Sequence, residues 1–288
     1  MLDACGWILE KLNTLLQGMT TQDTILWSNL SSIEGNLYGY AKLAQPYILA
    51  VGYTFLGLFF LIELWNISKH VEGFGGGPQM GVEMIFGLLV KLLLCKLIMD
   101  NSFILMEALY NKIASITGSV ASGWAAGGTL ALSTETVGTE GTFFVMIAVF
   151  LLALVVLLVV AAAWLISRII IWLRFIEIFL YMIVAPIPLA TLPSDEWGQI
   201  GKGFLKSFIS LCLQGLLIYL ILSLFPVIAG SVSPGDTLVD TELAIINQLL
   251  TAAGMSVLLI IALFGSNRLA NSIMGSAEVR RRKNANRS

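Results

Sequence analysis

Residues 143–167 read FFVMIAVFLLALVVLLVVAAAWLIS. A helix needs about 20 apolar residues to cross the hydrocarbon core of a bilayer, and this run is long enough. Only helices and closed barrels satisfy their backbone groups where there is no water. The apolar residues are continuous and do not alternate with polar ones, so the run predicts a membrane-spanning helix.

The composition of the whole chain agrees with this stretch. Hydrophobic residues make up 57% of the 288 residues and charged residues only 12%, and the mean hydropathy is +0.88. Soluble domains carry about 25% charged residues, so this chain has too little charge to cover a soluble globule. We therefore predict an all-α polytopic helical membrane protein.

Four more apolar runs are long enough to cross a membrane. The first two are joined by the Gly-rich turn Gly73–Pro78, which predicts a helical hairpin. The stretch from Asp100 to Gly141 is rich in small residues and is expected to lie outside the bilayer, holding part of a helix. The four runs are Pro46–Trp65, Val82–Met99, Phe208–Ala229 and Ile245–Phe264.

The first twenty residues follow a helical pattern. Ile8, Leu12 and Leu16 recur at helical spacing, with Glu10 and Lys11 between them. We interpret the segment as a retained amphipathic helix and not as a cleaved signal peptide. Either the helix lies along a membrane interface or it packs on its own protein, and the pattern fits both.

The apolar character that begins at Phe143 continues to Leu192, about twice the length that one crossing needs. We therefore expect the chain to turn near the membrane. In the preferred topology, Phe143–Ser167 crosses once and Phe175–Leu192 forms a re-entrant element broken at Pro186 and Pro188. The alternative makes Ile169–Leu192 a sixth full crossing.

The positive charges favour five crossings plus the re-entrant element. Lysines and arginines gather on the cytosolic side of membrane proteins. Five crossings place the N-terminus outside and the basic tail in the cytosol. The following residues then lie on the cytosolic side: Lys69, Arg168, Arg174, Lys202, Lys206, Arg268, Arg280, Arg281, Arg282, Lys283 and Arg287.

These assignments divide the chain into five segments. Residues 1–44 are the N-terminal amphipathic extracytoplasmic segment and 45–99 the transmembrane hairpin. Residues 100–142 are extracytoplasmic, 143–267 are the transmembrane core with the Pro-broken helix, and 268–288 are the basic cytosolic tail. The tail is interpreted mainly as a topology determinant, with attraction of nucleic acid or anionic lipid as the alternative.

Charged residues inside the predicted spans are candidates for function, because each is costly in hydrocarbon and normally faces protein or water. Either they line a polar conduit or those near helix ends extend to the interface. Arg174 and Glu177 are three residues apart and could pair on one helix face. The candidate conduit residues are Glu63, Glu83, Lys91, Lys96 and Glu177.

Catalytic patterns are missing from the sequence. His70 is the single histidine, so neither a histidine metal cluster nor a Ser-His-Asp set is suggested. The Gly-rich turn lacks a following Gly-Lys-Ser/Thr, so it is not a phosphate-binding loop. Cys5, Cys95 and Cys212 show no disulfide or zinc spacing. We expect no enzymatic activity and no cofactor.

One region carries a family resemblance. It reads WLRFIEIFLYMIVAPIPLA (residues 172–190), followed by GKGFLKSF (residues 201–208) and LQGL (residues 213–216). An Arg-containing helix, an Ala-Pro break, a Lys/Gly-rich turn and a helix with Gln-Gly resemble the TrbL-type polytopic channel subunits of type IV secretion systems. The resemblance covers mainly Phe143–Asn271.

The resemblance implies a multi-pass component of the bacterial inner membrane in a conjugation machine, with its N-terminus outside and its C-terminus in the cytosol. Such subunits are thought to form homo-oligomeric rings among membrane lipids, around the route of single-stranded DNA bound to relaxase. Their energy comes from a companion ATPase. The matching positions are Arg174, Pro186, Pro188, Lys202, Lys206, Gln214 and Gly215.

Arg168 joins this set as a residue expected at the helix break and its cytosolic contacts. Small residues such as Gly52, Gly57 and Gly87 are expected to permit close approach of helices or subunits. The alternative function is a small-molecule secondary transporter, a class that often shows paired broken helices. One Pro break is visible without a twin in the N-terminal half, which favours the channel subunit.

Overall fold

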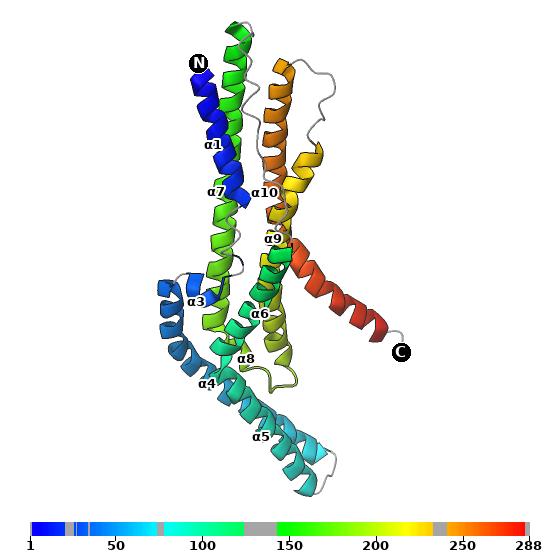
Figure 1. Ribbon diagram of the computed structural model, residues 1–288. Coiled ribbons are helices and arrows are strands. Elements are labelled where there is room, and N and C mark those ends of the chain that lie inside the picture. The colour runs from blue at the N-terminus through cyan, green and yellow to red at the C-terminus, as the bar shows by residue number, and fades with distance from the viewer. Residues whose placement is uncertain are drawn as a thin grey trace. The chain divides into compact units, whose positions relative to one another are not determined.

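The computed structural model describes residues 2–20, 26, 28–33, 35–73, 78–123, 143–232 and 241–285. Every regular element in these ranges is a helix, as the sequence predicts (Figure 1). The helices are α1 (Leu2–Thr20), α3 (Leu30–Ile33), α4 (Gly35–Gly73), α5 (Pro78–Asp100), α6 (Ser102–Gly123), α7 (Phe143–Val184), α8 (Pro186–Leu189), α9 (Gly198–Val232) and α10 (Thr241–Ala285).

Four of the described helices are long and apolar enough to cross a membrane, and the chain is a polytopic helical membrane protein. The candidate spans are Asn36–Val71, Ile147–Val184, Gly198–Leu224 and Leu249–Ile273. The predicted crossing Val82–Met99 lies on α5 and is not among them. Glu83, Lys91 and Lys96 make that stretch more charged than the other four runs.

Helix α7 differs from the expectation for the long apolar region. It runs without interruption for 42 residues from Phe143 to Val184, so the predicted turn near Arg168 and Arg174 is wrong. The physical reason is that no Gly or Pro lies between Phe143 and Val184, and Pro is the residue that breaks helices most strongly. The break expected at Pro186 is present, because α7 ends directly before it.

The chain forms two compact units, and each draws on segments that are far apart in the sequence. Unit 1 comprises Met1–Trp27, Ala114–Arg174 and Leu213–Ser272. Unit 2 comprises Ser28–Ile113, Phe175–Cys212 and Ile273–Ser288.

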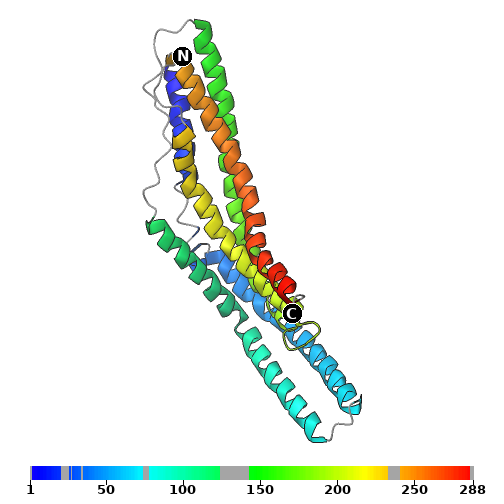
Figure 2. The same ribbon diagram turned by 90° about the vertical axis from the view of Figure 1, so that its right-hand side faces the viewer.

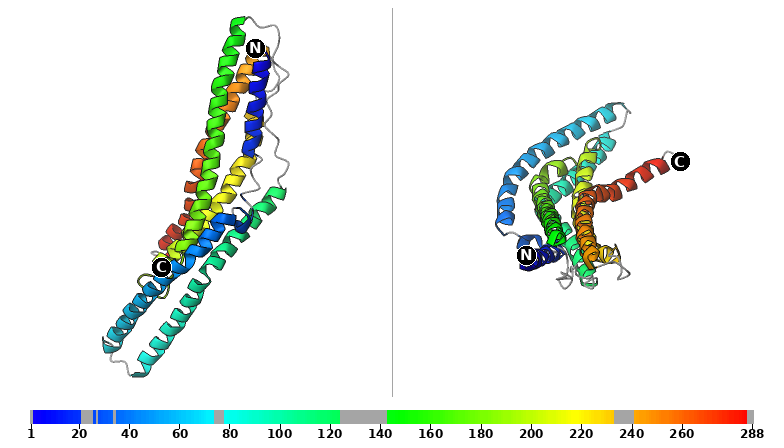
Figure 3. Two further views of the ribbon diagram at one scale, coloured as in Figure 1. Left: turned by 90° about the vertical axis from the view of Figure 1, so that its left-hand side faces the viewer. Right: turned by 90° about the horizontal axis from the view of Figure 1, so that it is seen from above.

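In unit 1, helix α1 packs against α7 and α10 (Figures 1 and 3). One hydrophobic cluster contains Ile8, Leu12 and Leu16 of α1. Buried α7 residues between Ala153 and Ala163 belong to it, as do Leu249 and Ala252 of α10. Of the two interpretations of the N-terminal helix, the structure supports packing on its own protein. The apolar positions predicted from their spacing are the ones that are buried.

In unit 2, helices α4 and α5 form the predicted hairpin and lie side by side (Figure 2). Two hydrogen bonds join α4 to the helices that follow it. The Tyr38 hydroxyl donates to Glu107 Oε2 of α6 at 2.9 Å, and the Tyr53 hydroxyl donates to Asp100 at the end of α5. Helix α6 supplies 22 helical residues in the segment where part of a helix was expected.

At Gly52, helix α4 lies close to both α5 and α8. A Cβ atom on Gly52 would lie 2.9 Å from the Met99 side chain and 3.0–3.1 Å from Pro186. Gly57 and Gly87 have open space in the corresponding positions. The close approach predicted for small residues is therefore seen within the chain at Gly52.

Parts of the predicted features lie outside the described residues. These are residues 74–77 of the Gly-rich turn and residues 124–142 of the predicted extracytoplasmic segment. The backbone of α10 is helical through the basic tail to Ala285.

We predict that Gly52→Val lowers the thermal midpoint of the detergent-solubilised protein, because overpacking costs about 1–3 kcal/mol and the Pro186 backbone cannot move aside freely. Gly57→Val is the matched control on the same helix and should leave the midpoint within experimental error. Equal midpoints for the two variants would show that the Gly52 contact does not hold α4 to α8.

Candidate functional site: the Pro-break segment and a buried polar layer

The segment that connects α7 to α9 is named here the Pro-break segment and comprises residues 185–197. Pro has no backbone N–H and clashes with the preceding turn, so α7 cannot continue through Pro186. Helix α8 provides a single turn, in which the Leu189 N–H donates to the Ala185 carbonyl at 3.2 Å. Two further bonds tighten the chain after it, from Thr191 N–H to the Pro188 carbonyl and from Leu192 N–H to the Leu189 carbonyl.

The chain re-enters a helix at Ser194. The Ser194 hydroxyl oxygen accepts from the Trp197 N–H at 3.3 Å, and the Ser194 carbonyl accepts from the Gly198 N–H at 2.9 Å. This is the bonding pattern of an N-cap serine. Asp195 and Glu196 follow Ser194, at the end of the helix where the positive end of the dipole favours carboxylates.

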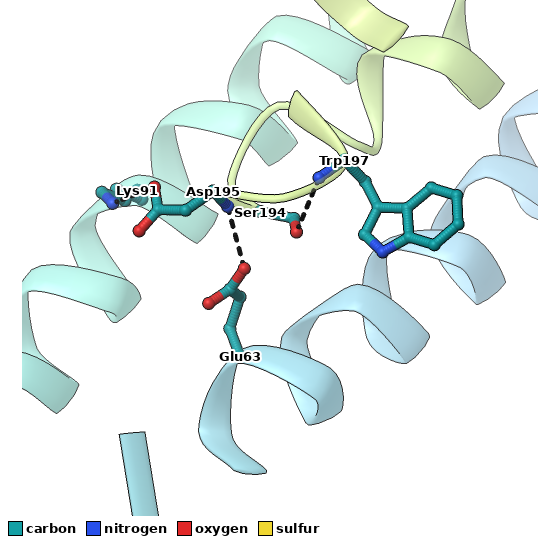
Figure 4. Close-up of polar contacts among 5 residues, drawn as sticks. All are labelled: Glu63, Lys91, Ser194, Asp195 and Trp197. Carbon is teal, nitrogen blue, oxygen red and sulfur yellow. Dashed lines mark hydrogen bonds and ion pairs between the residues drawn. The ribbon is translucent and has the colours of Figure 1, made fainter. Parts of the chain in front are cut away.

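Glu63 of α4 adds a second cap from another part of the chain (Figure 4). Its Oε1 atom accepts from the Asp195 backbone N–H at 2.9 Å. Glu63 is buried, with only 7% of its surface exposed. Backbone N–H groups in a first helical turn lack intrahelical partners, and a hydrogen bond to a charged acceptor contributes about 1.5–3 kcal/mol. Glu63 therefore ties α4 to the start of α9.

Lys91 of α5 contacts the same residue through its side chain. Lys91 Nζ lies 3.1 Å from Asp195 Oδ1, and the two side chains are 54% and 82% exposed. An exposed ion pair of this kind contributes about 0–1 kcal/mol in water. The Lys91–Asp195 pair positions Asp195, but Glu63 makes the stronger attachment.

Apolar and backbone contacts complete the attachment of the Pro-break segment. The Phe59 and Trp197 rings lie 6.2 Å apart, and Cys95 Sγ donates to the Leu189 carbonyl at 3.2 Å. The Gly201 N–H donates to Thr191 Oγ1 at 3.0 Å, which folds α9 back on the segment. We call the set Glu63, Lys91, Asp195 and Trp197 the clamp.

The other predicted conduit residues do not join the clamp. Glu83 and Lys96 of α5 and Glu177 of α7 are exposed, and none has an ion-pair partner within the ranges that the structure describes. On α9, Lys202 is exposed and Lys206 is partly exposed, on the first turns after the segment.

A second polar group lies within unit 1, where α7, α9 and α10 meet. Arg174 is 3% exposed and Gln214 is 7% exposed, both within apolar helices. The Arg174 guanidinium lies directly over Gly215, in space that a Cβ atom on that residue would overlap. Gln214 Nε2 donates to Ser266 Oγ across 3.5 Å. We call Arg174, Gln214, Gly215 and Ser266 the polar layer.

The polar layer brings together Arg174, Gln214 and Gly215, three positions that match the family resemblance, and adds Ser266, which the sequence did not single out. Arg174 and the Gln214-Gly215 pair are separated by about forty positions and meet because Gly215 has no side chain. Gln214 Oε1 is buried without a hydrogen-bond partner in the described part of the chain, and an unsatisfied buried acceptor costs about 1–3 kcal/mol.

The pairing of Arg174 with Glu177 is not the arrangement seen. Arg174 is buried against Gly215, whereas Glu177 is exposed one turn later. Arg168 is partly buried and its guanidinium lies 5.6 Å from the centre of the Trp164 ring, a cation–π contact.

The described residues contain no group of three or more His, Cys, Asp or Glu side chains that could hold a metal ion. The clamp and the polar layer hold helices and a helix start in position. Their polar atoms contact backbone groups and neighbouring side chains.

Comparison of the chain with protein-family models, with curated proteins and with solved structures finds no match.

Asp195, which both Glu63 of α4 and Lys91 of α5 contact, was not singled out from the sequence. A signal was present in Pro193-Ser-Asp-Glu-Trp197, because a serine followed by two acidic residues is typical of a helix start. That Glu63 and Lys91 reach this point had no signal in the sequence, since they are 132 and 104 positions away from Asp195.

We predict that Glu63→Ala exposes the Pro-break segment. In a protein whose other native cysteines are replaced, the buried Cys95, which donates to the Leu189 carbonyl, should react faster with a water-soluble maleimide once Glu63→Ala is added, because the Asp195 N–H loses its acceptor and the Pro-break segment is held less tightly. Glu83→Ala is the control, since Glu83 is exposed and has no ion-pair partner among the residues that the structure describes. Equal labelling rates in the two backgrounds would contradict the role of Glu63 as a cap.

We predict that Gly215→Ala destabilises the protein, because the new methyl group displaces the Arg174 guanidinium. Gly203→Ala on the same helix is the matched control, as Gly203 has open space around it. If the overlap with Arg174 is the cause, Gly215→Ala should cost much less stability in an Arg174→Ala background. Additive losses of thermal stability in that double-mutant cycle would contradict the contact.

Proposed function

We propose that this chain is a membrane scaffold subunit of a type IV secretion channel, of the TrbL type, that mediates conjugative transfer of single-stranded DNA–protein complexes. The observation that carries the proposal is that residues matching the TrbL-type pattern contact one another or shape the helix break. Pro186 and Pro188 form the Pro-break segment, and Arg174 meets Gly215 in the polar layer.

The type of contact also supports a scaffold. The clamp uses Glu63 and Lys91 to hold the start of α9, and such bonds fix the relative positions of helices. A channel subunit needs this kind of positioning and no bond chemistry of its own. In the proposal the energy comes from a companion ATPase.

The proposed setting is the bacterial inner membrane, with the N-terminus outside and the C-terminus in the cytosol. This topology counts the more charged helix α5 as a fifth crossing beside the four apolar spans. The support is the distribution of charge. Arg168 and Arg174 lie at one end of the uncharged run of α7, and Lys202 and Lys206 follow the Pro-break segment. Several copies form a ring with other secretion subunits, and the single-stranded DNA–relaxase complex passes through it transiently.

We predict that deletion of the gene abolishes conjugative transfer from the organism that encodes it, with recipient counts as the measurement. Complementation with Gly203→Ala should restore transfer, whereas Gly215→Ala should restore it poorly. Native mass spectrometry of protein extracted in mild detergent should show a homo-oligomer. Undiminished transfer after deletion, or saturable uptake of a small molecule by proteoliposomes containing this chain alone, would overturn the proposal.

A further inference from the structure

Where α1 packs on α7 and α10, unit 1 has two chemically different faces. Leu12 and Leu16 of α1 belong to the same buried cluster as Val156 and Val160 of α7. The N-terminal helix therefore lies alongside the middle of the uncharged run Phe143–Ser167, and not beyond its end.

The side of α1 that faces away from this cluster is hydrophilic. Glu10, Lys11 and Thr14 are exposed. Successive residues in a helix are about 100° apart, so Glu10 and Thr14 lie nearly opposite Leu12. The Lys11 Nζ atom lies 5.9 Å from the centre of the exposed Trp7 ring. We call Glu10, Lys11 and Thr14 the polar face of α1.

The outward side of α7 at the same level is aliphatic. Val155 is 56% exposed and Leu158 is 64% exposed, and both are adjacent in sequence to cluster residues. On α10, Leu250 is exposed beside the buried Leu249. Unit 1 therefore presents charged groups on one side and a hydrocarbon surface on the other.

In the proposed topology this level is the middle of the crossing Phe143–Ser167, so α1 reaches into the bilayer from the outer side, whereas the sequence placed residues 1–44 outside it. The uncharged run from Phe143 to Ser167 is about 37 Å long at the helical rise, against about 30 Å for the hydrocarbon core. Cluster residues Ala153–Ala163 cover the middle of that run, and Arg168 follows it on the cytosolic side. Charged side chains at such a depth face protein or a water-filled cavity.

We propose that the polar face of α1 lines an aqueous route through the membrane, while Val155, Leu158 and Leu250 face lipid. Unit 1 is then a section of the conduit wall, with α1 toward the route and α7 and α10 toward lipid. The route contains water and accepts hydrophilic cargo, and Glu10 and Lys11 carry opposite charges on its wall. The inference deepens the proposed channel function and rests on its topology.

The test measures which solvent each face meets. Two single-cysteine variants, Thr14→Cys and Leu158→Cys, are made with the native cysteines replaced, labelled with a nitroxide and reconstituted in liposomes as the full-length oligomer. Collision rates are measured by electron paramagnetic resonance with oxygen, which concentrates in lipid, and with a water-soluble nickel chelate.

We expect the nickel chelate to relax the label at Thr14 several-fold more than the label at Leu158, and oxygen to show the reverse order. Lipids with nitroxides at defined acyl positions should place Leu158 in the hydrocarbon core. Water-accessible labels at both sites would mean that this level lies outside the bilayer, and lipid-accessible labels at both would mean that α1 is buried in lipid. Either result overturns the inference.

A matched control separates folding from accessibility. Leu12→Cys lies on the buried side of the same helix, so its label should collide with neither reagent. The outcome is also independent of the cargo. If deletion of the gene leaves conjugation intact but Thr14 meets water and Leu158 meets lipid, the aqueous wall stands and the secretion assignment falls.

Discussion

In a helical membrane protein, a backbone group without a partner is expensive, because no water is present in hydrocarbon to bind it. A proline that ends a helix creates such groups on both sides of the break. This chain places Pro186 and Pro188 after its longest apolar helix and then satisfies the exposed N–H groups with Ser194, Thr191 and Glu63. The arrangement of α4, α5, α8 and α9 in unit 2 follows from this requirement.

The clamp shows how one buried carboxylate organises several helices. Glu63 reaches the start of α9 only because α4 runs close to α8, and that approach depends on the missing side chain of Gly52. Lys91 then binds the side chain of the residue whose N–H Glu63 holds. A glycine, a carboxylate and an ammonium group from two helices thus fix the position of a third.

The polar layer applies the same principle to a buried cation. A guanidinium stays protonated in proteins, so Arg174 needs a polar setting among apolar helices. The guanidinium lies over Gly215, which leaves room for it, and the adjacent residue, Gln214, donates to Ser266 of α10. Because Arg174 lies on α7, Gln214 and Gly215 on α9 and Ser266 on α10, the layer joins these three helices at one level of unit 1.

The sequence by itself determined the all-α membrane class, the helix break at Pro186 and the buried face of α1, because hydrophobic length, proline chemistry and helical spacing are local properties. It misjudged α7, where length suggested a turn although no residue in the stretch breaks a helix. Only the tertiary structure decided that Glu63 caps α9, that Arg174 lies over Gly215 and that α1 packs on α7. These contacts join residues with no periodic relation in the sequence, and they form only where the packing of whole helices brings their side chains together.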